Sequence, residues 1–154
     1  MDAPGGAMTR ASLALAGWRP PAGRGARWTV LPGPGGLDGA IGLIDESYNS
    51  NPSALTASLK SAANFSKNRS RLFVLGEMRE LENFSADLHR ELGERFVSLF
   101  KEVPFTLIAV GNEMKAFAEA VKMGKPSHAV LEWCASGAEA HHSSTAWLGF
   151  PILT

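Results

Sequence analysis

Short apolar runs alternate along this chain with stretches in which apolar residues recur every three or four positions. Three such runs predict strands, at residues 40–44, 71–76 and 105–111, and the second of these is expected to be buried. Three stretches predict amphipathic helices, one beginning at Pro52 and the others at 85–100 and 113–122. Strands that alternate with helices favour an α/β fold, in which helices cover both faces of a mostly parallel sheet.

The two ends of the chain lack this rhythm. Residues 20–39 are rich in Gly and Pro, which indicates a domain junction with at most one short strand, at 27–31. A helix-compatible piece at 12–17 precedes the junction. Near the other end a fourth strand is expected at 128–131, but from Pro126 the pattern fades and no closing helix is predicted.

We therefore expect three parts along the chain. They are a remnant of a preceding domain with its linker (1–22), one α/β domain (23–125), and an atypical tail (126–154). The sheet is expected to be incomplete at its C-terminal end.

Composition narrows the classes of function. The 154 residues suit one domain, and 15 basic residues balance 15 acidic ones, so no basic surface indicates a nucleic acid or an anionic membrane. The lone Cys134 cannot form an internal disulfide, which fits a reducing cytoplasm. The apolar patch at 11–18 is too short to span a bilayer. The sequence thus predicts a cytoplasmic protein that does not insert into a membrane and that is a monomer if it is soluble.

The first candidate site follows the strand at 40–44. Ligands of open α/β sheets bind beyond the carboxyl ends of the strands, and this end carries Asp45, Tyr48, Asn49 and Asn51. A carboxylate there can accept hydrogen bonds from a ribose, a tyrosine can stack, and asparagines can bind a base or a peptide. The alternative is that the two asparagines only shape the turn and cap the helix at Pro52.

A second candidate site follows the strand at 71–76. Glu77 and Glu80 come directly after it, and Glu80 can act as a base only if burial raises its pKa. His89 shares a helix face with Ser85, four positions earlier, and a lone histidine there is more often structural than catalytic.

Several familiar motifs are missing from the sequence. The glycines at 33–39 fail as a dinucleotide fingerprint, because Asp38 stands at the third glycine position and the run precedes a strand. The chain contains no Gly-x-x-x-x-Gly-Lys-Ser/Thr phosphate loop and no metal-ligand spacing. We expect no metal site and assign no catalytic residue.

Three segments, in order, resemble the Mur ligases. They are Gly23-Arg24-Gly25, LIDESYNSNPSAL at 43–55, and RLFVLGEMREL at 71–81, with Ser85 and His89 following. The resemblance covers about residues 23–123 and is greatest to the Mur ligases that add D-alanyl-D-alanine. Glu77, Ser50 and Glu82 depart from the usual Asp, Ala and Gly of that pattern.

The resemblance implies the Rossmann-like C-terminal domain of a three-domain cytoplasmic enzyme. Such an enzyme joins D-alanyl-D-alanine to a UDP-N-acetylmuramoyl-tripeptide in peptidoglycan synthesis, using ATP and magnesium through an acyl phosphate. Its phosphate loop lies in the central domain, of which residues 1–22 would be a remnant. The domain resembled here closes over the nucleotide.

The resemblance also implies roles for individual residues. Arg24 would reach the ATP phosphates, and Asp45 would lie near the ribose. Tyr48, Asn49 and Asn51 would line the nucleotide and dipeptide side; with Ser53, the two asparagines are the candidate substrate contacts.

Alternative functions remain open. Without a phosphate loop we expect the fragment to be inactive alone and to bind no cofactor securely. It could instead be a non-catalytic module that binds a nucleotide or a peptide. The third reading is the C-terminal domain of another Mur ligase or of a folylpolyglutamate-type ligase.

Overall fold

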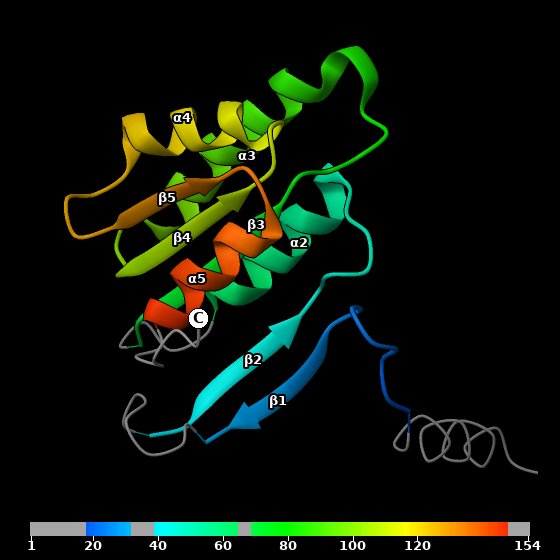
Figure 1. Ribbon diagram of the computed structural model, residues 1–154, viewed down its shortest axis with the longest axis vertical. Helices are drawn as coiled ribbons and strands as arrows, with labels where there is room; N and C mark the ends of the chain where they lie inside the picture. Colours follow the sequence, from blue (N-terminus) through cyan, green and yellow to red (C-terminus); the bar gives the residue numbers. More distant parts are fainter. Residues whose placement is uncertain (1–17, 32–38, 65–68, 148–154) are drawn as a thin grey trace, which may run out of the picture.

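The centre of the molecule is a three-stranded parallel sheet. The computed structural model describes residues 18–31, 39–64 and 69–147. Within them, β3 (Arg71–Gly76), β4 (Phe105–Val110) and β5 (Val130–Cys134) pair in the order β3-β4-β5 (Figure 1). These strands confirm the predicted parallel sheet, with β5 shifted two to three residues from the expected position.

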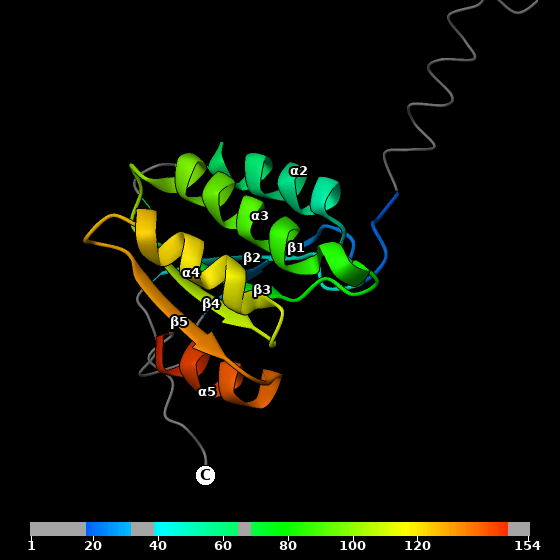
Figure 2. The ribbon, with the colours of Figure 1, turned by 90° about the horizontal axis from the view of Figure 1, so that it is seen from above.

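Helices cover both faces of this sheet, as predicted. On one face lie α2 (Pro52–Ala63), α3 (Ser85–Phe100) and α4 (Met114–Gly124), while α5 (Gly137–Trp147) lies on the other (Figure 2). A short 3-10 turn, η1 (Glu82–Phe84), leads into α3. None of the helices in the described ranges is long and apolar enough to cross a membrane.

Aromatic side chains fill the larger core, between the sheet and the three helices. The ring centroid of Phe96, on α3, lies 5.0 Å from that of Phe73 on β3 and 5.1 Å from that of Phe105 on β4. Phe100 and Phe117 pack against the same ring. Together with Leu92, these rings explain the apolar periodicity that the sequence shows from Leu92 to Phe100, because they share the face of α3 that packs on the core.

The C-terminal part of the chain corrects one prediction. We expected no closing helix after Pro126, yet α5 forms there and covers a small cluster of Ile108, Cys134 and Ala140. Among the α5 residues whose burial the structure describes, 137–144, Ala140 is the buried hydrophobic residue, so this part of the helix packs through a small side chain. Such a helix has no wide apolar stripe to recognise in the sequence.

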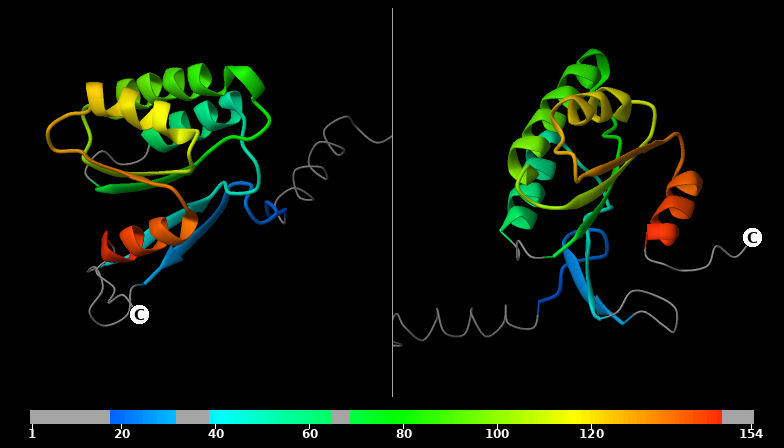
Figure 3. Two further views of the ribbon diagram at one scale, coloured as in Figure 1. Left: turned by 45° about the horizontal axis from the view of Figure 1, so that its top comes forward. Right: turned by 90° about the vertical axis from the view of Figure 1, so that its left-hand side faces the viewer.

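The first predicted strand also pairs differently from the expectation. β2 (Ile41–Asp45) forms an antiparallel hairpin with β1 (Ala26–Val30), apart from the parallel sheet (Figure 3). Paired residues Trp28 and Leu43 are each about half exposed. The sequence identified both strands, but the pattern of apolar residues does not specify which strand is the partner.

Some predicted features fall where nothing is described. The helix-compatible piece at 12–17 and nearly all of the glycine run at 33–39 lie outside the described residues.

Candidate functional site

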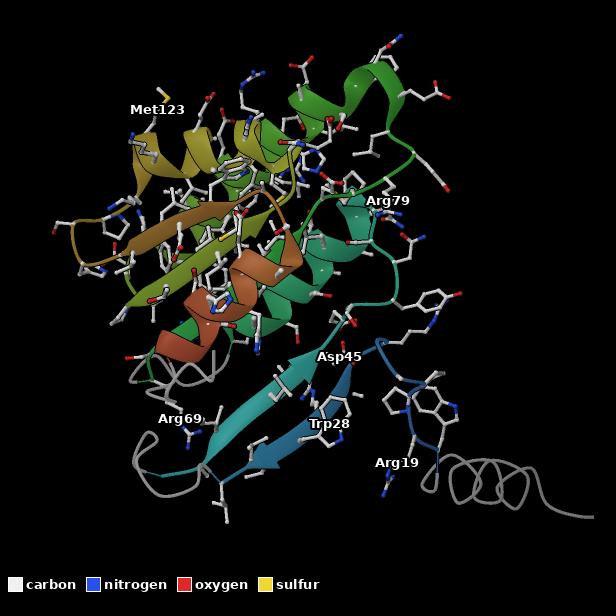
Figure 4. All side chains as sticks on the ribbon, in the orientation of Figure 1. Arg19, Trp28, Asp45, Arg69, Arg79 and Met123 are labelled. Atoms are coloured by element: carbon white, nitrogen blue, oxygen red, sulfur yellow. The ribbon has the colours of Figure 1, made fainter. Side chains whose placement is uncertain are left out.

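The polar loops identified in the sequence lie on one side of the molecule. β2, β3, β4 and β5 all run with their carboxyl ends toward this side (Figure 1). Asp45, at the end of β2, and Arg79, in the loop after β3, lie on it (Figure 4). This arrangement is the one that open α/β sheets use for ligands.

A hydrogen-bonded clamp joins the junction loop to the end of β2. The backbone N–H of Gly23 donates to Asp45 Oδ2 (3.0 Å), and that of Gly25 donates to the Asp45 carbonyl (2.8 Å). The N–H of Tyr48 donates in turn to the Gly23 carbonyl (3.1 Å). We call the 23–25 loop and the 45–48 segment together the clamp. Residues that are 20 to 25 positions apart in sequence are thereby held side by side.

Glycine is required at one position of the clamp. Gly23 has φ +73°, in the left-handed region that glycine adopts without steric cost. A Cβ atom at this position would lie 2.7 Å from the backbone nitrogen of Tyr48. Any other residue would therefore force the two segments apart, which gives a physical reason for the Gly that precedes Arg24.

Asp45 is a structural acceptor within the clamp. Besides Gly23, its carboxylate accepts a hydrogen bond from the backbone N–H of Ser47 (3.0 Å). The Ser47 side chain, then the backbone of Ser47 and, more weakly, that of Gly23 stabilise the charged form. They hold the pKa of Asp45 below its ordinary value, against a smaller opposing effect of desolvation.

Acid is expected to loosen the clamp. Because the folded pKa of Asp45 is lowered, its contribution is complete above about pH 4 and is lost as the pH falls through the folded value. The amide proton shifts of Gly23 and Ser47, followed by NMR, should therefore titrate together in acid. The Asp45→Asn variant should show no such titration. Amide shifts that titrate equally in both proteins would contradict this role.

The side chains of Arg24 and Tyr48, one from each segment of the clamp, contact each other. The guanidinium carbon of Arg24 lies 4.1 Å from the centroid of the Tyr48 ring, a cation–π contact. Both side chains are exposed. In the part of the chain that the structure describes, the Arg24 guanidinium pairs with no carboxylate. The site therefore offers an uncompensated guanidinium next to an aromatic ring.

The two asparagines have the structural roles that the sequence left open. Asn51 is the N-cap of α2, and its side-chain oxygen accepts the backbone N–H of Ala54 (2.8 Å). The side-chain oxygen of Asn49 accepts the N–H of Ser50 (2.8 Å). The turn and cap reading is confirmed, while the amide N–H groups of both side chains give them further donors toward a ligand.

Ser53 lies beside a groove between α2 and α3. The groove has a volume of about 330 Å³. Its lining residues are Pro52, Ser53, Thr56, Leu88, Glu91, Leu92 and Arg95. The structure thus brings Arg24, Asp45 and Tyr48 together, with Asn49 and Asn51 next along the chain and Ser53 in the first turn of α2.

In the loop after β3, the second candidate site, Glu77 caps the N-terminus of α4. Glu77 Oε2 accepts the backbone N–H of Glu113 (3.2 Å), at the N-terminus of α4, and its carboxylate lies against Gly111. Negative charge at this end of a helix is stabilising. Sequence reasoning missed this contact because 36 residues separate the partners. Glu80 is exposed and has φ +63°.

His89 is structural, as predicted. It is fully buried, its Nδ1 faces the Ser85 carbonyl (2.8 Å), and its Nε2 accepts the backbone N–H of Met78 (3.2 Å). This network assigns the proton to Nδ1. His89 therefore ties the loop after β3 to α3 and leaves no free ring nitrogen for chemistry.

The carboxyl ends of β4 and β5 carry a further cation–π pair that the sequence did not reveal. Lys115 Nζ lies 4.8 Å from the ring centroid of Trp133, whose indole N–H donates to the Gly111 carbonyl (2.8 Å). Across the described ranges, no group of three His, Cys, Asp or Glu side chains could hold a metal ion.

Comparison with known proteins places most of the chain in one family. Residues 27–146 match the family model described as Mur ligase, glutamate ligase domain. This match spans β1 to α5 and so includes the strand and helix found after Pro126. No curated protein matched the chain.

Proposed function

Since the chain belongs to the Mur ligase family, as a C-terminal domain of that family, we propose that it serves an ATP-dependent amide ligase that adds D-alanyl-D-alanine. The other substrate would be the UDP-N-acetylmuramoyl-tripeptide of peptidoglycan synthesis. The clamp would face the nucleotide, and the start of α2 would face the dipeptide.

The observation that carries this proposal is the Arg24 guanidinium on the clamp. An arginine with five N–H donors and no carboxylate partner among the described residues suits a phosphate group. Asp45 and Tyr48 lie beside it. Together they offer a cation for the phosphates, a carboxylate for the ribose hydroxyls and an aromatic ring.

The clamp residues fit ATP. Arg24 would hold the phosphates, and Tyr48 would lie beside it on the nucleotide side. The Asp45 carboxylate accepts the backbone N–H groups of Gly23 and Ser47, one on each oxygen, and the Ser47 side chain, which leaves a lone pair on one oxygen for a ribose hydroxyl. Bound ATP would supply the phosphoryl group that activates a carboxylate toward an amine. Magnesium finds no acidic cluster in the described residues, so we give it no ligand from this chain.

The choice of D-alanyl-D-alanine rests on the segment Tyr48-Asn49-Ser50-Asn51-Pro52. Its asparagine oxygens are used for the turn and the cap, while their amide groups can donate to a carboxylate or a peptide carbonyl. Ser53 adds an exposed hydroxyl one residue later. These donors lie just before α2 and in its first turn, where the helix dipole favours a negative terminus of the dipeptide.

We expect no ligase activity from the chain by itself, because its sequence contains no phosphate loop. The test is a chimera in which the C-terminal domain of a Mur ligase that adds D-alanyl-D-alanine is replaced by residues 23–147. ADP release in the presence of tripeptide precursor should depend on D-alanyl-D-alanine, and the free chain should release none.

The same assay contains its counter-tests. ADP release that depends on glutamate or another amino acid would show a different acceptor and favour another Mur or folylpolyglutamate-type ligase. A folded chimera that binds MgATP but forms no product with any acceptor would favour the non-catalytic binding module. Either result would overturn the assignment of D-alanyl-D-alanine.

A further inference from the structure

We propose that Tyr48 is the positioning residue for Arg24, holding the guanidinium on the clamp so that its donors face a phosphate group. This inference rests on the proposed function, because it assigns Arg24 to the nucleotide phosphates. It adds that Tyr48 acts through Arg24 and not through the base.

The clamp fixes the geometry of the pair. The backbone N–H of Tyr48 donates to the carbonyl of Gly23, the neighbour of Arg24, so the two side chains start from linked backbone positions. The guanidinium then lies 4.1 Å from the ring centroid. The closeness of Gly23 to Tyr48 leaves no room for either segment to shift toward the other.

Asp45 does not compete for the arginine. Its two carboxylate oxygens accept the backbone N–H groups of Gly23 and Ser47, at 3.0 Å each. Glu46, the other acidic residue of the clamp, lies with its carboxylate against Gly25 and forms no ion pair with Arg24 among the described residues. The Arg24 guanidinium therefore lies beside the aromatic ring without a carboxylate partner in the clamp.

The chemistry of the contact explains why a ring suits this purpose. A guanidinium that stacks by its face keeps its N–H donors in plane and available for a phosphate. A carboxylate partner would instead occupy the same donors. An unheld exposed arginine would lose rotamer freedom on binding, and pre-ordering it reduces that cost.

The experiment uses the whole chain, isotope-labelled for NMR, with two probes: inorganic tripolyphosphate and MgATP. The variants are Tyr48→Phe, which keeps the ring, Tyr48→Leu, which removes it, and Phe84→Leu as the control. Phe84 is 68% exposed and Tyr48 is 66% exposed, so the control removes an equally exposed aromatic side chain.

Removing the ring in Tyr48→Leu is expected to lower the binding affinity for each of the two probes about two- to five-fold. This is the range expected from the loss of an exposed cation–π contact. Tyr48→Phe and Phe84→Leu should bind like the natural chain. The Cδ protons of Arg24 should show a ring-current shift in the natural chain and in Tyr48→Phe, and should lose it in Tyr48→Leu.

Three results would overturn the inference, and they separate it from the proposed function. Equal binding by Tyr48→Leu and the natural chain would remove the role of Tyr48 and leave nucleotide binding intact. If Tyr48→Leu bound MgATP more weakly than the natural chain but bound tripolyphosphate equally well, Tyr48 would act on the base. Absence of binding of either probe by the natural chain would overturn the proposed function together with the inference.

Discussion

Replacing Phe96 by alanine is expected to lower the free energy of unfolding by about 3–5 kcal/mol. Phe96 is fully buried and contacts aromatic rings from β3, β4, α3 and α4. Alanine would leave a cavity that these rings can fill only in part. A domain of this size has a stability of about 5–15 kcal/mol, so the loss would be a large share of the total.

The matched control is Phe84→Ala. Phe84 lies in η1 at the entrance of the same helix but is 68% exposed, so its removal should change stability by less than about 0.5 kcal/mol. Urea unfolding of the three proteins measures both changes. Equal losses for the two variants would show that the aromatic cluster does not form the core described here.

Replacing Gly93 by alanine is expected to be the second most damaging change. Gly93 lies on α3 where that helix contacts α4, and a Cβ atom there would lie 2.6 Å from the Phe117 carbonyl oxygen and 2.9 Å from Ala120 Cβ. Overpacking of this kind costs about 1–3 kcal/mol. Alanine favours a helix over glycine by only about 1 kcal/mol, and a backbone oxygen cannot rotate away. The net effect should be a loss of up to about 2 kcal/mol.

The variant Gly137→Ala separates the gain in helix propensity from the cost of overpacking. Gly137 begins α5, and a Cβ atom there would have no heavy atom within 4 Å. This variant should be neutral or slightly more stable in a thermal melt, while Gly93→Ala should melt earlier. If Gly93→Ala melted later than the natural chain, the close contact of α3 with α4 would be wrong.

Local patterns made most of the fold predictable. The apolar run at 71–76 and the periodic leucines and phenylalanines of 85–100 correspond to β3 and α3, because burial on one face imposes their spacing. Pro52 and Asn51 marked the start of α2 for a local reason, the geometry of its cap. Such signals are contained within a few neighbouring residues.

Pairing and packing through small side chains could not be predicted in this way. The apolar run at 40–44 does not reveal that β2 pairs with β1, and α5 buries an alanine where a stripe of larger residues would have been visible. The capping of α4 by Glu77 depends on an approach of β3 to β4. Each of these features is set by contacts between distant segments.

For the candidate site too, the sequence identified residues but not the contacts between distant segments. Residue types and the family resemblance selected Arg24, Asp45 and Tyr48, and the structure brings these three together. The two glycines of the 23–25 loop explain how, through positive φ angles that allow the loop to lie against β2. That Asp45 would be used by backbone N–H groups was not visible in the sequence.

The most direct test of the clamp as the nucleotide site is an amide NMR titration of the chain with MgATP. We predict that the largest shift changes fall on the 23–25 loop and on 45–48, with smaller ones at the start of α2 and none on α5. Shift changes centred on the ends of β4 and β5, or none within the clamp, would contradict the account.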